Sequence, residues 1–84
     1  MIDLKWIQYF IACVDKESFS SAAEALFTTQ PNVSKAIKAL ENEMGFQVFE
    51  RHIKGITLTD DGWILYQYAL NIEENIQKIE QLKR

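Results

Sequence analysis

The 84-residue sequence predicts a mainly α-helical fold, in which three helices and a two-stranded hairpin precede one long C-terminal helix. Three observations predict it. Apolar residues recur at helical spacing in separate segments, residues that favour helix N-caps stand just before those segments, and two short extended segments flank Gly55. We therefore expect residues 1–58 to form a compact domain and residues 59–84 to form a long helix.

The first helix is predicted from Leu4 to about Lys16. Asp3 precedes it and is suited to cap its N-terminus. One face of this segment is apolar at helical spacing and should pack against a core, through Leu4, Ile7, Phe10, Ile11 and Val14.

The second helix is short and is predicted from Ser21 to about Leu26. Ser18 and Ser20 are alternative N-caps for it. Its small residues Ala22 and Ala23 permit close approach by a neighbouring helix. Only residues 27–29 separate this helix from the next, which indicates two helices joined by a three-residue turn.

The third helix is predicted between Thr29, as its N-cap, and Gly45, which ends it. Pro31 lies in the first turn, where a missing N–H costs nothing. The buried stripe consists of Val33, Ile37, Leu40 and Met44. The opposite, exposed stripe consists of Pro31, Lys35, Lys38 and Asn42, with Ser34 beside it and Gln30 at the helix entrance. Amide, hydroxyl and ammonium groups at a helix N-terminus are suited to phosphates and base edges.

A hairpin is predicted next, with extended segments at 47–51 and 56–58 around the turn 52–55. Gly55 is available for a positive φ angle in this turn. Thr59 then caps the last helix, with Asp60 and Asp61 placed favourably against its dipole. Neither proline nor glycine follows Gly62, so this helix should continue to the chain end.

This order of elements is that of a winged helix-turn-helix, and three stretches resemble the signature of the LysR-type transcriptional regulators. They are Ser18-Phe19-Ser20-Ser21-Ala22-Ala23-Glu24-Ala25-Leu26, Gln30-Pro31-Asn32-Val33-Ser34-Lys35-Ala36-Ile37-Lys38-Ala39-Leu40-Glu41, and Gly45-Phe46-Gln47-Val48-Phe49-Glu50-Arg51. Leu58, Thr59 and Gly62 also match. The resemblance spans essentially the whole chain.

The resemblance implies a DNA-binding domain whose third helix enters the major groove and whose wing contacts adjacent backbone or the minor groove. The DNA-contacting residues it implies are Gln30, Pro31, Asn32, Ser34, Lys35, Lys38, Arg51, His52 and Lys54. The family often has arginine where Lys35 stands, and lysine cannot reproduce the fork of arginine on guanine. Contacts from Lys35 are therefore expected to favour phosphate. Family members normally continue into a ligand-sensing domain, so the chain is expected to be a fragment.

The last helix carries apolar residues at a 4-3-4-3 spacing that resembles a heptad seam: Leu65, Ala69, Ile72, Ile76 and Ile79. We expect a second copy to cover this seam, giving a homodimer, or a tetramer in the full-length protein. Trp63, Tyr66 and Leu70 lie on another side and are expected to pack onto the first helix. Two reading helices related by a two-fold axis would require an interrupted palindrome in double-stranded DNA.

Composition is consistent with a cytoplasmic DNA-binding protein that has neither cofactor nor metal and performs no catalysis. The net charge is −3, but segment 28–58 has four bases and three acids, which leaves −4 for the rest. No apolar run approaches the roughly 20 residues of a membrane span, and a lone cysteine and a lone histidine provide neither a metal site nor a catalytic pair. The larger aromatics are expected in the core, namely Trp6, Phe10, Phe19, Phe27, Phe46 and Phe49.

A second class of function remains open from the residues alone. Winged helices also serve as protein-docking modules, and an acidic chain with an exposed seam is suited to pairing with a partner protein. The lysines Lys35 and Lys38 favour DNA binding over protein docking, because docking does not require a lysine-bearing stripe on the third helix.

Overall fold

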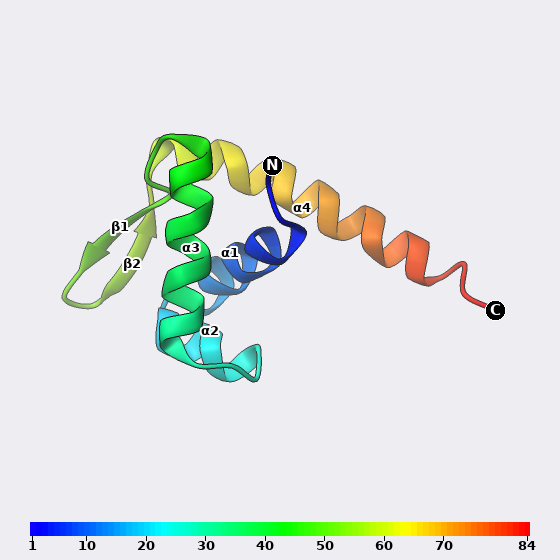
Figure 1. Ribbon diagram of the computed structural model, residues 1–84, viewed down its shortest axis with the longest axis horizontal. Coiled ribbons are helices and arrows are strands. Elements are labelled where there is room, and N and C mark those ends of the chain that lie inside the picture. Colours follow the sequence, from blue (N-terminus) through cyan, green and yellow to red (C-terminus); the bar gives the residue numbers. More distant parts are fainter.

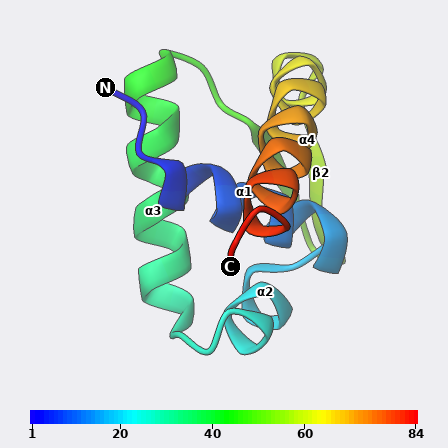
Figure 2. The ribbon, with the colours of Figure 1, turned by 90° about the vertical axis from the view of Figure 1, so that its right-hand side faces the viewer.

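The computed structural model describes all residues, 1–84, and confirms the mainly helical winged fold. Its elements are α1 (Leu4–Lys16), α2 (Phe19–Ala25), α3 (Gln30–Met44), β1 (Phe49–His52), β2 (Gly55–Leu58) and α4 (Asp60–Glu80) (Figure 1). Helix α1 runs between α3 on one side and α4 on the other (Figure 2). The core therefore forms around α1.

Side-chain caps start the helices where the sequence predicts them, with one correction. Asp3 Oδ1 accepts from the Lys5 amide at 2.8 Å, and Thr59 Oγ1 accepts from the Gly62 amide at 2.9 Å. For α2 the cap is Ser18, whose Oγ accepts from the Ser21 amide at 3.0 Å. The helix consequently begins at Phe19 and not at Ser21, and the Ser20 hydroxyl is free for another role.

The core is built from aliphatic and aromatic side chains of every element. The largest fully buried side chains are Phe10, Ile37, Leu40, Val33, Val48 and Cys13. The Phe49 ring packs against Phe10 and Phe19, with centroid separations of 5.4 and 5.9 Å. These aromatic contacts join β1 to α1 and α2. Trp6 and Phe46 are half-buried at the edge of the same core.

The expectation that Phe27 is a core residue was wrong. Its side chain is 98% exposed, and its φ angle is 55°. Helix α2 ends at Ala25, so Phe27 lies in the tight turn before α3. It therefore no longer falls on the buried face that the helical spacing gives to Ala22 and Ala23. The left-handed backbone turns its side chain into solvent.

The wing is an antiparallel hairpin with Phe49 opposite Leu58 and His52 opposite Gly55. It starts at Phe49, later than the predicted Gln47, and its turn consists of residues 53 and 54. Gly55 has a φ of +140°, and a Cβ there would lie 2.8 Å from the carbonyl oxygen of Glu17. The turn end of the wing, at Gly55, therefore lies against the backbone of Glu17 between α1 and α2, and glycine is required at this contact.

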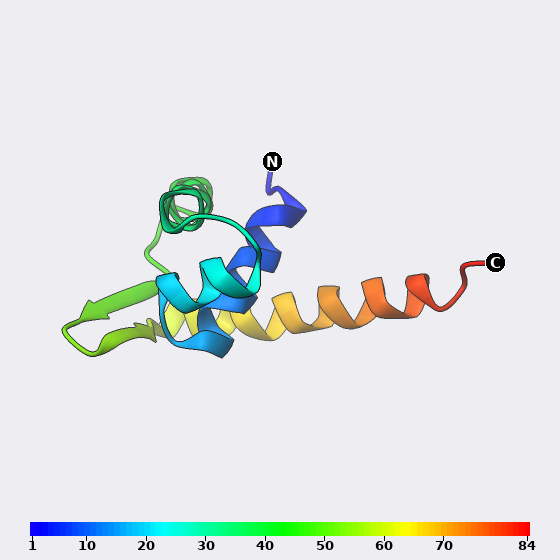
Figure 3. The same ribbon diagram turned by 90° about the horizontal axis from the view of Figure 1, so that it is seen from below.

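Helix α4 has two parts with different surroundings. Near its start, Gly62 and Ala69 are buried, and the Tyr66 hydroxyl donates to Asp15 Oδ1 of α1 at 3.1 Å. The C-terminal part projects away from the domain, in the direction opposite to the wing (Figure 3). The helix ends at Glu80, four residues before the predicted chain end. None of the helices combines the length and the apolar character that crossing a membrane would need.

The predicted dimerisation seam was wrong at its N-terminal end. Ala69 is fully buried in the core of its own chain, and Leu65 is half-buried against that core. Ile76 lies half-buried in a hollow beside Leu4 and Ile7 of α1. Ile72 and Ile79 remain 37% and 63% exposed, whereas Trp63 and Leu70, which were expected on α1, are 54% and 36% exposed.

Apart from Trp63 and Leu70, the exposed apolar residues of α4 and of the residues just after it follow another stripe, which is rotated round the helix from the predicted seam and shares Ile72 and Ile79 with it. We call it the free stripe; it consists of Ile64, Tyr68, Ile72, Ile79 and Leu82. A heptad spacing fits the predicted seam, and it also fits the free stripe from Tyr68 onward, with Asn75 at the position between Ile72 and Ile79. The packing of α4 on α1 decides which of the two stripes is covered within the chain.

Candidate nucleic-acid interface

The exposed face of α3 carries the predicted reading residues. Val33, Ile37 and Leu40 are buried, and the opposite side presents Gln30, Pro31, Asn32, Lys35 and Lys38 to solvent. Ser34 is half-buried beside them. The helix begins at Gln30 because Thr29 caps it, so the polar residues of the first turn stand at the positive end of its dipole.

Two of the amide side chains on this face are held by hydroxyl groups. The Ser20 hydroxyl of α2 donates to Gln30 Oε1 at 3.0 Å. Asn32 Nδ2 donates to Thr28 Oγ1 at 3.0 Å, so the Asn32 side chain turns back toward the turn that precedes α3. Gln30 is therefore oriented by a neighbouring helix, whereas Asn32 is tied to its own turn.

The wing presents three basic or imidazole side chains in different settings. The Arg51 guanidinium carbon lies 4.6 Å from the centroid of the Phe19 ring, a cation–π contact that holds the charge beside α2. His52 Nε2 lies 2.8 Å from Thr57 Oγ1 on the opposite strand. Lys54 is exposed in the turn at the wing tip.

The structure brings part of the predicted set together around one hollow between the α2–α3 unit and the wing. This hollow has a volume of about 230 Å³, and Ser20, Gln30, Arg51 and His52 are among its lining residues. Residues from α3 and from the wing thus share one surface. Lys35, Lys38 and Lys54 do not line it; the first two are exposed farther along α3 and the third is exposed in the wing turn.

A second hollow reveals a residue that the sequence reasoning missed. It lies between α1 and α3, has a volume of about 390 Å³, and is lined by Lys5 and Trp6 of α1 together with Asn32 and Lys35 of α3. Lys5 adds a positive charge beside Lys35. No sequence signal indicates this, because the proximity depends on how α1 and α3 cross.

The basic side chains of the predicted interface take part in no salt bridge. Lys35, Lys38, Arg51 and Lys54 make no ion pair, whereas Lys78 and Lys83 on the C-terminal segment pair with Glu74 and Glu80 at 3.4 and 2.6 Å. An unpaired cation on an exposed surface can replace the counterions of a phosphate without first losing a protein partner. This surface therefore offers an anion-binding face despite the net charge of −3.

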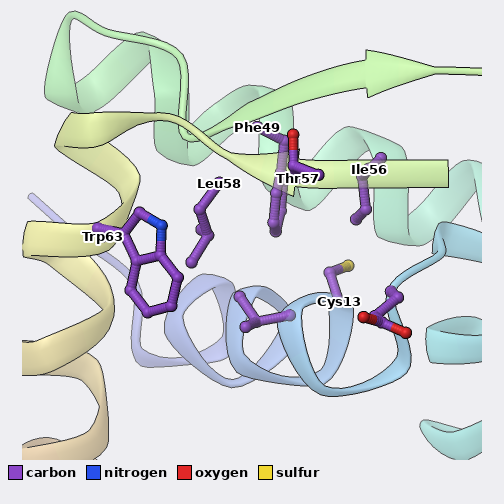
Figure 4. Close-up of a pocket in the computed structure, with 8 residues that line it drawn as sticks. Cys13, Phe49, Ile56, Thr57, Leu58 and Trp63 are labelled. Atoms are coloured by element: carbon purple, nitrogen blue, oxygen red, sulfur yellow. The ribbon is translucent and has the colours of Figure 1, made fainter.

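The most apolar of the larger hollows lies elsewhere and has different chemistry. It has a volume of about 350 Å³ between α1, β2 and the start of α4, with Trp63 and Leu58 toward one end and Ile56 and Cys13 toward the other (Figure 4). Burial raises the pKa of the Cys13 thiol to about 12. The thiol is therefore protonated at neutral pH and is a poor nucleophile.

Comparison with known proteins identifies the family to which this domain is similar. Residues 4–63 match the model of the "Bacterial regulatory helix-turn-helix protein, lysR family". The transcriptional regulator BenM of Acinetobacter baylyi is 37% identical over 84 residues, which are 99% of this chain and 28% of BenM. The regulator CitR of Bacillus subtilis is 38% identical over 76 residues, 90% of this chain and 26% of CitR. The chain thus spans less than a third of these relatives.

Solved structures agree with the sequence comparison. The crystal structure of the BenM DNA-binding domain with catB site 1 DNA superposes with a TM-score of 0.90 at 35% identity, covering 95% of this chain and 90% of that one. The CbnR DNA-binding domain in its DNA complex gives 0.87 at 29% identity, covering 94% and 91%. The fold and the basic face define a winged helix-turn-helix DNA-binding domain. The chain belongs to the LysR family of bacterial transcriptional regulators.

Proposed function

We propose that this domain binds double-stranded DNA with sequence specificity as a two-fold dimer, and that it thereby directs a LysR-type regulator to an interrupted palindrome in a bacterial promoter. The observation that carries the proposal is the single hollow on which Gln30, Arg51 and His52 meet, together with exposed lysines on α3 and the wing that form no salt bridge. Unpaired bases supply affinity through phosphates, and the carboxamide supplies base discrimination.

The relatives support this proposal. The BenM and CbnR domains that share this fold were solved as complexes with DNA, and the curated relatives are named as transcriptional regulators. We accordingly assign the chain a binding role without catalysis. A regulator of a bacterial chromosome acts in the cytoplasm, which is the location we propose.

The free stripe of α4 supports the dimer. Ile79 is 63% exposed on the part of α4 that extends beyond the rest of the domain, and Leu82, just after the helix end at Glu80, is 73% exposed. Apolar side chains at heptad spacing on a projecting helix favour pairing with a second helix. We propose that Ile72 and Ile79, which belong to both the predicted seam and the free stripe, lie at this interface.

Selection of bound sequences from a random duplex library tests the proposal. We expect enrichment of two related half-sites in inverted orientation, separated by about one helical turn or a multiple of it. Recovery of no common sequence, at a salt concentration where the protein still shifts duplex DNA, would refute base-specific reading.

A Lys54→Ala variant should flatten the salt dependence of DNA binding. Each phosphate contact contributes about −0.9 to the slope of log affinity against log salt concentration for B-DNA, so the slope should change by roughly one unit. The measurement is a fluorescence-anisotropy titration at several salt concentrations. Lys83→Ala is the matched control, because Lys83 is paired with Glu80 on α4. A slope equal to that of the control would remove Lys54 from the interface.

A Gln30→Ala variant should relax preference at one base position in each half-site. A lost bidentate contact costs about 1 to 3 kcal/mol of discrimination at that position. Binding to scrambled duplex should change little, since phosphate contacts remain. An equal loss on cognate and scrambled DNA would show that Gln30 contributes to affinity alone.

A further inference from the structure

Ser20 and Gln30 form the only side-chain hydrogen bond between α2 and α3. The Ser20 hydroxyl donates to Gln30 Oε1 at 3.0 Å across ten residues of sequence. Both residues are exposed, and both line the hollow that faces the wing. Because Ser18 supplies the N-cap of α2, the Ser20 hydroxyl has no capping role.

The chemistry of this bond suits a base-reading side chain. A glutamine carboxamide has two acceptor sites on its oxygen and two donors on its nitrogen. Ser20 uses one acceptor site and leaves one acceptor and both donors free. The adenine edge in the major groove presents one donor, N6, and one acceptor, N7. The hydrogen-bonding capacity that Ser20 leaves on Gln30 is therefore sufficient for a bidentate contact with adenine.

The bond also restricts the Gln30 side chain before DNA arrives. Glutamine is among the side chains that lose most rotamer freedom when they are fixed. Gln30 is exposed, and no other side-chain hydrogen bond holds it. A side chain already held in one orientation loses less freedom when it contacts a base, and this increases affinity for the matching base.

We propose that Ser20 is a positioning residue that sets the base specificity of Gln30 without touching a base itself. The inference rests on the proposed function, since it requires Gln30 to read a base. It assigns a specificity role to α2, in addition to the residues presented by α3 and the wing.

A double-mutant cycle tests this role. Affinity is measured for the selected half-site and for its three single-base variants at the Gln30 position, using wild type, Ser20→Ala, Gln30→Ala and the double variant. We expect Ser20→Ala to reduce discrimination at this position about 5-fold, the effect of one net hydrogen bond. In the Gln30→Ala background, Ser20→Ala should have no effect.

Two further variants separate the hydroxyl from the shape of the side chain. Ser20→Thr keeps a hydroxyl and should retain discrimination, whereas Ser20→Val has nearly the shape of threonine and should lose it. Ser21→Ala, at the adjacent exposed position, should behave as wild type. Thermal melting of each variant verifies that the fold is retained.

Several results would overturn the inference. Unchanged discrimination in Ser20→Ala would exclude positioning by this hydroxyl. An equal loss on all duplexes that persists in the Gln30→Ala background would assign Ser20 to a phosphate contact instead. Equal behaviour of Ser20→Thr and Ser20→Val would also contradict it. Failure of the proposed function is distinguishable, because wild-type protein would then select no sequence.

Discussion

An Ile79→Asp variant should sediment as a monomer and bind its operator at least about 100-fold more weakly. Ile79 is 63% exposed near the end of α4 and packs against no core residue of its own chain. A carboxylate buried in an apolar seam costs several kcal/mol unless it is paired. A monomer engages one half-site and loses the effective concentration that links the two reading helices. Sedimentation velocity and an electrophoretic shift measure the two effects.

The matched control is Gln67→Asp, which introduces the same charge at an exposed position of α4 outside the free stripe. It should remain dimeric and bind the operator as wild type does. Ile76 is a poorer test site, because it is half-buried between α1 and α4 and its substitution also perturbs the monomer. An Ile79→Asp protein that stays dimeric at micromolar concentration would contradict pairing through the free stripe.

The helix boundaries were predictable because they depend on short-range chemistry. Asp3, Thr29 and Thr59 cap the helices that follow them, and Gly45 ends α3 with a φ of +80°. In each case the deciding hydrogen bond or backbone conformation involves residues within one helical turn. The cap of α2 was ambiguous for the same reason, since Ser18 and Ser20 both precede the apolar residues.

The covered face of α4 was not predictable from its own sequence. The spacing that starts at Leu65 and the spacing that starts at Tyr68 both fit a heptad, and Ile72 and Ile79 belong to both. The packing of Leu65, Ala69 and Ile76 against the rest of the domain distinguishes them. Periodicity identifies an apolar face but not the element that covers it.

In the proposed DNA-binding interface, too, some features could be predicted from the sequence and others could not. The stripe with Lys35 and Lys38 follows from helix geometry, because the buried residues of α3 determine which side remains exposed. The contact of Arg51 with the Phe19 ring joins elements far apart in the sequence. The position of Lys5 beside Lys35 likewise depends on tertiary packing. Such tertiary contacts determine which groups surround each side chain. Residue type and spacing along the sequence do not reveal them.

A Gly62→Ala variant should be strongly destabilised, by about 3 kcal/mol. A Cβ at Gly62 would lie 2.2 Å from the carbonyl oxygen of Val48, so backbone must move to admit it. For a domain of this size each kcal/mol lowers the melting temperature by roughly 4 to 8 °C. Thermal unfolding followed by circular dichroism measures the change. Gly45→Ala is the control, because its added Cβ meets no atom within 4 Å and its cost is limited to about 1 kcal/mol for the left-handed backbone.

The crowding at Gly62 matters because the segment around Val48 connects α3, the proposed reading helix, to α4, the proposed dimerisation helix. The Val48 amide donates to Glu41 Oε2 of α3 at 2.8 Å, and the Val48 carbonyl accepts from the Thr59 amide at 3.1 Å. Displacing Val48 strains both bonds, so Gly62→Ala should also broaden the range of half-site spacings that the dimer accepts. Equal melting temperatures for Gly62→Ala and Gly45→Ala would show that the backbone at Val48 moves at little cost in stability. That result would contradict a role of this segment in fixing the angle between α3 and α4.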